Sequence, residues 1–148
     1  MLVRRCERCG TKNRVDPSDL VNEIRCDKCK EILGPTAGVI AAALRDLRNV
    51  GMAQKVPLVV LFSGLFCPQS KQMLAQLAPV AAKWVGKALF FNVAVEENAD
   101  VGTVGVRVTP TLMLGKRAAL LHTHEGMAPV PDIEEWLRRA SAAREVTA

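Results

Sequence analysis

Five cysteines hold most of the chemical potential of this 148-residue chain. Four of them form two Cys-x-x-Cys pairs, Cys6 with Cys9 and Cys26 with Cys29, and sixteen residues separate the pairs. Two such turns can bring four thiolates together as ligands of a tetrahedral Zn²⁺ ion. We therefore predict one structural zinc ion, with all four coordination positions filled by the protein and none left for a substrate.

The alternative for these cysteines is that one pair is a redox-active dithiol, which two matched pairs at this spacing disfavour. Gly10 follows the first pair and can adopt the positive φ that such turns often use. We expect residues 1–33 to form a small zinc ribbon that needs the metal to fold. Removing the metal should then unfold the ribbon and leave the remainder folded.

The fifth cysteine, Cys67, stands alone in the segment Phe66-Cys67-Pro68-Gln69-Ser70. A buried strand is predicted just before it and a helix just after it, with Pro68 suited to the first helical turn. Free N–H groups and the dipole at a helix N-terminus stabilise a thiolate. The alternative is an inert buried cysteine; we favour a reactive thiol.

Alternating strands and helices must position these residues, so we predict an α/β fold with a central mixed sheet flanked by helices. Pro79 is expected to kink or break the second helix. The predicted elements are a helix over 40–50, a strand over 56–62, a helix over 70–84, a strand over 88–95, a short connecting helix, strands over 111–114 and 118–124, and a helix over 132–143.

The chain divides by composition into three parts. Residues 1–33 form the predicted ribbon, 34–40 a linker rich in turn-forming residues, and 41–144 the second domain. The ribbon holds eight Lys/Arg and six Asp/Glu, and no aromatic residue precedes Phe62, so we expect no nucleic-acid partner despite the net charge of +5. No long apolar run or secretory signal is evident, and thiolate ligands suit a reducing compartment, so we expect a cytoplasmic protein without a membrane partner.

The order of these features resembles the thioredoxin family, and the four-cysteine ribbon resembles its two-domain bacterial zinc-ribbon branch, thioredoxin 2. The resemblance rests on the strand before Phe66-Cys67-Pro68-Gln69-Ser70, on Val108-Thr109-Pro110-Thr111 and on Gly126 before the last helix. It implies a thioredoxin fold and reaction with protein thiols and disulfides. It also implies that Cys67 is the attacking thiol, that Pro110 is a cis-proline facing it, and that Phe66, Pro68, Thr109, Pro110 and Gly126 contact the substrate.

The chain departs from the family pattern at coordinated positions. Ser70 replaces the resolving cysteine, Leu61 replaces the acidic residue assigned to deprotonating that cysteine, and Asn92 aligns with its usual lysine neighbour. A hydroxyl has no thiol proton to remove, and a buried carboxylate would only cost desolvation free energy. An engineered change at Ser70 alone would leave Leu61 and Asn92 unexplained, so we favour a natural monothiol site with Cys67 and Ser70 as the catalytic residues.

A single thiol can form a mixed disulfide, but an external thiol must resolve it, and glutathione is the obvious candidate. The Cys-Pro-x-Ser pattern is similar to that of monothiol glutaredoxins. One alternative is a redox-inactive, chaperone-like module that binds proteins; another is an iron–sulfur cluster shared by two subunits. We expect His122 and His124 to be a solvated pair, and Glu96, Glu97 and Asp100 only to begin the connecting helix.

Overall fold

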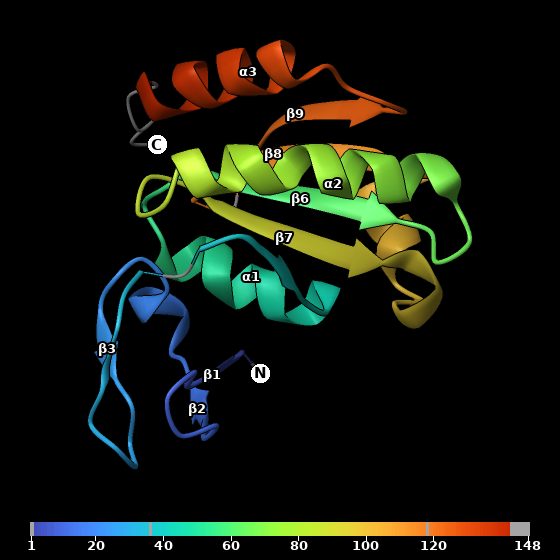
Figure 1. The fold of residues 1–148 in the computed structure, drawn as a ribbon. Coiled ribbons are helices and arrows are strands. Elements are labelled where there is room, and N and C mark those ends of the chain that lie inside the picture. Colours follow the sequence, from blue (N-terminus) through green and yellow to red (C-terminus); the bar gives the residue numbers. More distant parts are fainter. Residues whose placement is uncertain (1, 36, 118, 143–148) are drawn as a thin grey trace.

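A five-stranded mixed sheet forms the centre of the computed structural model, which describes residues 2–35, 37–117 and 119–142 (Figure 1). The strand order is β5-β7-β6-β8-β9. Strands β5, β7 and β6 are parallel, β8 runs antiparallel to β6, and β9 runs antiparallel to β8. The bounds of the sheet strands are β5 Val39–Ala41, β6 Leu58–Ser63, β7 Leu89–Ala94, β8 Thr111–Lys116 and β9 Ala119–Glu125.

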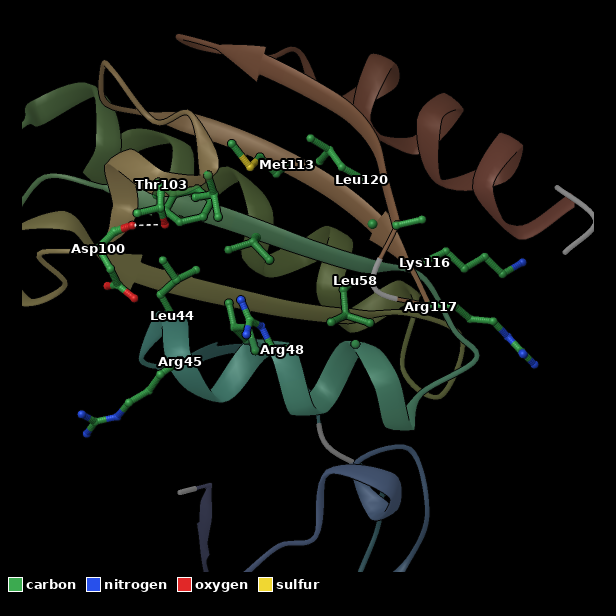
Figure 2. Close-up of a pocket in the computed structure, with 17 residues that line it drawn as sticks. Leu44, Arg45, Arg48, Leu58, Asp100, Thr103, Met113, Lys116, Arg117 and Leu120 are labelled. Carbon is green, nitrogen blue, oxygen red and sulfur yellow. Dashed lines mark hydrogen bonds between the residues drawn. The ribbon is translucent and has the colours of Figure 1, made fainter. Parts of the chain in front are cut away.

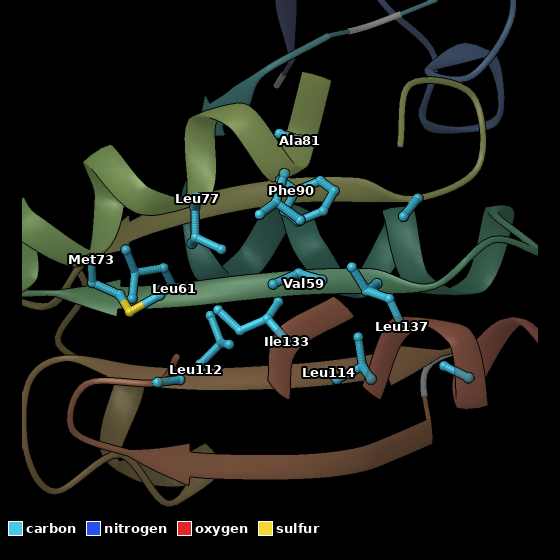
Figure 3. Close-up of a cluster of buried hydrophobic side chains, with 14 residues drawn as sticks. Val59, Leu61, Met73, Leu77, Ala81, Phe90, Leu112, Leu114, Ile133 and Leu137 are labelled. Atoms are coloured by element: carbon cyan, nitrogen blue, oxygen red, sulfur yellow. The ribbon is translucent and has the colours of Figure 1, made fainter. Parts of the chain in front are cut away.

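Helices cover the two faces of the sheet unequally. Helices α2 (Pro68–Lys83) and α3 (Val130–Ala142) lie on one face, and α1 (Leu44–Ala53) lies on the other (Figure 1). The α2 and α3 face holds a dense apolar cluster that includes Leu61, Leu77 and Leu137, each fully buried (Figure 3). The runs 58–63 and 89–94 are apolar on both faces, as strands in the middle of a covered sheet must be.

The predicted α/β order is confirmed, with local differences. Residues 39–41 pair with β7 instead of beginning a helix, and α1 starts only at Leu44. The Leu44 amide donates to the side-chain oxygen of Asn98 at 3.0 Å, so a residue distant in sequence sets where α1 begins. Helix α2 runs through Pro79 without a break, and the Pro79 side chain is exposed.

The predicted connecting helix is replaced by two short 3₁₀ turns, η2 (Val95–Glu97) and η3 (Val101–Val104). Gly105, with φ of 89°, ends η3. The last strand and helix lie close to their predicted ranges, although Ala118, Ala143 and Arg144 fall outside the described residues. No helix in the described ranges is both long and apolar enough to cross a membrane.

The N-terminal module consists of two short antiparallel hairpins joined by a 3₁₀ turn. The first hairpin pairs β1 (Val3–Arg5) with β2 (Lys12–Arg14), and the second pairs β3 (Ile24–Arg25) with β4 (Ile32–Leu33). The turn η1 (Pro17–Asp19) lies beside α1.

This module shares a core with the sheet domain. Leu2, Val15 and Leu20 belong to the same apolar cluster as Leu47 and Val50 of α1. The Gln54 side-chain amide also donates to the Pro17 carbonyl at 2.6 Å. The sheet begins at Val39, so the last residues of the segment predicted as a linker already pair with β7. The division at residues 33 and 40 stays a prediction.

Replacing Leu20, which is 1% exposed, with alanine should destabilise the sheet domain as well as the N-terminal module. Loss of a buried leucine side chain costs about 2–5 kcal/mol. Urea unfolding followed by tryptophan fluorescence provides the measurement, because Trp84 and Trp136 both lie outside the module. The control is Ile32→Ala, at a side chain that is 53% exposed. An unchanged tryptophan transition in Leu20→Ala would show that the two parts unfold independently.

Candidate functional site

The four N-terminal cysteines lie together. Their sulfur atoms are all within 4.8 Å of one another. The Cys6 and Cys29 sulfurs are 3.7 Å apart, and those of Cys9 and Cys26 are 3.5 Å apart. Four sulfurs at the usual Zn–S distance of about 2.3 Å would be about 3.8 Å from each other in a regular tetrahedron. The predicted ligand set is thus brought together in a geometry that could hold a metal ion.

Both cysteine pairs are shaped by the same backbone turn. In the first turn the Gly10 amide donates to the Cys6 carbonyl at 2.8 Å, and in the second the Lys30 amide donates to the Cys26 carbonyl at 3.0 Å. Gly10 has φ of 75°, as expected, and Lys30 takes the same conformation with φ of 65°. Each turn therefore requires a left-handed residue directly after its second cysteine.

Peptide groups in the second turn also favour thiolate formation. The Cys29 and Lys28 amides, with the Asn13 side chain, lower the pKa of Cys26 to about 6, against the opposing effect of burial. A metal-binding thiol must lose its proton, so these donors reduce the cost of binding a cation at Cys26. At Cys29 the Glu31 amide acts in the same direction, but burial and the other three sulfurs raise the pKa to about 11.

Cys67 occupies the N-cap position of α2, between the end of β6 and Pro68. Its side chain is half-buried, whereas Phe66 is 90% exposed and Pro68 is exposed. The predicted position at a strand-to-helix junction is therefore observed.

Ser70 connects the two elements at this junction. The Gly64 amide donates to the Ser70 hydroxyl oxygen at 3.1 Å, in a fully buried contact. The hydroxyl can in turn donate its own proton to the Cys67 sulfur. Ser70 is 1% exposed, so the hydroxyl in the middle of this chain from amide to sulfur is shielded from water.

Hydrogen bonds lower the pKa of Cys67 below the ordinary value for a cysteine thiol. The Ser70 hydroxyl makes the largest contribution, followed by the Thr109 hydroxyl and the Ser70 amide, while burial acts in the opposite direction. The neutral thiol has a separate contact, in which it donates to the Thr109 carbonyl at 3.7 Å. The donors favour the charged form of the sulfur, so the site stabilises a nucleophile.

The loop before β8 faces Cys67. The Thr109-Pro110 peptide bond is cis, as the family resemblance implied. The Gly126 amide donates to the Pro110 carbonyl at 2.7 Å, which places Gly126 beside the same loop. Contacts thus connect Thr109, Pro110 and Gly126, with Thr109 next to the sulfur; their role in substrate binding stays a prediction.

Glu96 also belongs to the site, although its type and position in the sequence did not indicate this. Both of its carboxylate oxygens accept from the Leu65 amide, at 3.0 and 3.2 Å. A β-carbon built on Gly64 would lie 3.1 Å from the Cys67 β-carbon, 3.1 Å from the Thr109 hydroxyl and 3.6 Å from Glu96. Glycine at position 64 therefore allows three segments to approach one another closely, and Glu96 holds the loop that leads to the thiol. An exposed acid just after a strand gave no sign of this contact.

The positions of the missing acid and its neighbour are filled without charge. Leu61 is fully buried in the apolar cluster under α2 (Figure 3). Asn92, which is aligned with Leu61 on the neighbouring strand, accepts a hydrogen bond from the Ser63 hydroxyl at 2.7 Å. The sheet beneath the site therefore provides no carboxylate at either position.

The expectation that His122 and His124 form a solvated pair is wrong. Both half-buried rings lie against Trp136 of α3, with centroid distances of 4.1 Å for His122 and 5.4 Å for His124. The second ring nitrogen (Nε2) of His124 contacts the Met127 carbonyl at 2.9 Å. An amphipathic imidazole can stack on an indole face, and here that packing replaces solvation.

The fold and the lone thiol define a thioredoxin-like protein, and the sequence comparison agrees. A family model described as Thioredoxin matches residues 47–139, so the chain belongs to the thioredoxin family, a family of thiol–disulfide oxidoreductases. Among curated proteins, thioredoxin C-3 of Corynebacterium nephridii is 26% identical over 133 residues, which cover 89% of this chain and 90% of the relative.

Solved structures show the same fold. Chloroplastic thioredoxin z matches with a TM-score of 0.66 at 21% identity and covers 73% of this chain and 98% of its own. The Malassezia sympodialis thioredoxin Mala s 13 has a TM-score of 0.63 at 21% identity, covering 74% of this chain and 96% of its own. The long form of spinach chloroplast thioredoxin f has a TM-score of 0.64 at 18% identity, covering 71% and 88%.

Replacing Ser70 with alanine should shift the alkylation of Cys67 to higher pH. The hydroxyl is the largest influence that lowers the Cys67 pKa, so its loss leaves less thiolate at a given pH below the midpoint. The rate of reaction with iodoacetamide, followed by peptide mass across pH, gives the midpoint. Ser141→Ala, at an exposed serine, should leave it unchanged. Equal midpoints for Ser70→Ala and the unaltered chain would contradict this account of the thiol.

Replacing Gly10 with alanine should weaken metal retention severalfold. A left-handed conformation costs a residue with a β-carbon about 1–2 kcal/mol, and Gly10 has φ of 75°. The measurement is loss of Zn²⁺ to a competing chelator from the metal-loaded protein. Gly34→Ala is the control, because no positive φ is found there and a β-carbon would meet nothing within 4 Å. Equal retention in both variants would argue against the turn geometry as a determinant of binding.

Proposed function

We propose that this protein is a monothiol thiol–disulfide oxidoreductase, which forms mixed disulfides through Cys67 and relies on an external thiol to resolve them. Ser70 supports this proposal most directly. Its buried hydroxyl lies one helical turn from Cys67 and can donate to the sulfur, but it cannot attack a disulfide. The other four cysteines all belong to the N-terminal cluster.

The first chemical step is attack by the Cys67 thiolate on a disulfide. A new S–S bond forms between Cys67 and one substrate sulfur, the substrate S–S bond breaks, and the other sulfur leaves as a thiolate. With a protein–glutathione mixed disulfide as substrate, glutathione moves to Cys67 and the protein thiol is released in its reduced form. The lowered pKa of Cys67 supports this step, because the thiolate is the attacking species.

The second step needs a thiol from solution. A glutathione thiolate attacks the glutathione sulfur of the mixed disulfide, and Cys67 leaves as a thiolate. The product is glutathione disulfide, so glutathione is oxidised by two electrons while the substrate is reduced. No acid stands at Leu61 to assist an internal resolving group, and none is required when the resolving thiol comes from outside. We infer that glutathione fills this role as the co-substrate.

The surface around Cys67 suits an extended protein segment. Phe66, next to Cys67 in the sequence, is 90% exposed, and Leu65 and Val108 are 44% and 46% exposed. Such exposed apolar side chains beside a reactive group are typical of an interaction surface. Backbone groups of Thr109 would pair with the substrate chain, as in β-strand addition. The proposed substrates are therefore protein disulfides and mixed disulfides.

We further propose that the N-terminal module is a zinc ribbon with a structural role, as in the bacterial zinc-ribbon branch of the family. Its sulfur geometry fits a Zn²⁺ tetrahedron with no open position. The match to thioredoxin C-3 spans 133 residues, more than the chain contains after residue 33, so it extends into this module. A cytoplasmic location, consistent with thiolate ligands, stays a prediction.

Intact-mass measurement of the zinc-loaded protein tests the redox proposal. Incubation with glutathione disulfide should add one glutathione to the unaltered chain and none to Cys67→Ser, and reduced glutathione should then remove it. An adduct that resists excess glutathione would favour the alternative, a redox-inactive module that binds proteins through the surface around Phe66. Absence of any adduct near neutral pH would refute the thiol chemistry itself.

A further inference from the structure

The sheet face that carries α1 contains a cavity of about 490 Å³, separate from the thiol site (Figure 2). Its floor is formed by strands β6 and β8 of the sheet, and its sides by α1, the turn η3 and the start of β9. The apolar lining residues are Leu44, Leu47, Leu58, Val60, Phe62, Val104, Met113, Ala119 and Leu120.

The cavity exists because this face is only partly covered. Between β7 and β8 the chain forms two 3₁₀ turns of three and four residues in place of a helix. Val60, in the middle of the central strand, is consequently half-buried, while its neighbours Val59 and Leu61 on the opposite face are 1% and 0% exposed. At the rim, Val104 is 40% exposed and Leu120 is 60% exposed. A central strand with an accessible apolar face is unusual for a sheet of this kind.

The charged residues that line the cavity are mainly basic. Arg45 and Arg48 of α1 contribute to the lining, with Lys116 and Arg117 at the end of β8 and Asp100 as the one acidic lining residue. Arg48 lies at the mouth, whereas Arg45, Lys116 and Arg117 extend away from the cavity (Figure 2). Within the described ranges the Arg48 guanidinium has no ion pair or hydrogen bond, whereas its backbone belongs to α1. Asp100 is on the η3 side, so an anionic group is favoured beside α1.

We propose that this cavity binds a single-chain amphiphile with one carboxylate, such as a medium-chain fatty acid. The apolar chain lies over Val60 and Met113, and the carboxylate pairs with Arg48, whose guanidinium can bind it through two parallel hydrogen bonds. The volume is within the range of about 300–1,000 Å³ common to small-ligand sites, and it is bounded by walls on several sides. The Arg48 guanidinium at the mouth disfavours a cationic head group.

Titration calorimetry of the full chain with dodecanoate, kept below its critical micelle concentration, tests the proposal. We expect saturable binding with one dodecanoate per chain. Arg48→Gln should weaken it about tenfold or more, as loss of a charge-assisted hydrogen bond implies. The matched control is Lys87→Gln, which removes one positive charge at an exposed lysine outside the cavity lining and should leave binding unchanged.

Two variants that fill the cavity distinguish binding inside it from a general affinity of the protein for apolar chains. Val60→Phe should block binding, and Val104→Trp at the exposed rim should do the same if Val60→Phe fails to fold. Dodecanol and dodecyltrimethylammonium are the head-group controls, and both should bind at least tenfold more weakly than dodecanoate.

Several results would overturn the proposal. These are equal binding of dodecyltrimethylammonium or dodecanol, full affinity in Arg48→Gln, and full affinity in the filled variants. Binding to anionic vesicles without binding to monomeric dodecanoate would identify a membrane-contact surface instead. Concentration-dependent dimerisation that Val104→Trp abolishes, without dodecanoate binding, would identify a second copy of the chain as the occupant.

Discussion

The hydrogen bond from the Gly64 amide to the Ser70 hydroxyl joins the end of the central strand to the first turn of α2. Both partners are buried, so the amide would remain without a partner if the hydroxyl were lost, at a cost of about 1–3 kcal/mol. Because Cys67 lies between these two residues, the same bond fixes where the thiol stands. The Cys67 thiol is thus positioned by the junction of two elements that are themselves held by the core.

Other segments converge on this junction from distant parts of the chain. Glu96 holds the Leu65 amide, Thr109 contacts the sulfur, and Gly64 has no side chain to keep them apart. The combination explains why a hydroxyl at position 70 is compatible with thiol activation. Ser70 supplies a hydrogen-bond donor to the thiolate and an acceptor for the backbone, two roles that a resolving thiol would fill only weakly. What it cannot supply is a second redox-active sulfur.

Spacing and local chemistry predicted the parts of the structure that depend on neighbouring residues. The cysteine pairs predicted their own cluster, and the apolar runs predicted β6 and β7. Pro68 after Cys67 indicated the start of α2. The cis bond at Pro110 followed from the family resemblance and not from the residues themselves. In these cases nearby side chains or a known pattern carried the information.

Features that depend on distant contacts were missed for identifiable reasons. Val39–Ala41 forms a strand because β7 pairs with it, although Ile40 also fits the apolar pattern of the helix that follows. Asn98 caps α1 from far along the chain, and Glu96 bonds to a loop that it approaches only in the folded protein. The cavity could not be foreseen, because the sequence predicted a covering helix where η2 and η3 form. Trp136 likewise packs on two histidines that strand alternation alone assigned to solvent.

If Ser70 makes the site dependent on an external resolving thiol, a mixed disulfide at Cys67 must be stable on its own. The most direct measurement is the lifetime of a mixed disulfide between Cys67 and a short peptide, followed by intact mass without any added thiol. We expect this adduct to persist in the unaltered chain and to disappear when glutathione is added. In Ser70→Cys it should be released spontaneously as an internal disulfide forms. Spontaneous release from the unaltered chain would contradict this dependence.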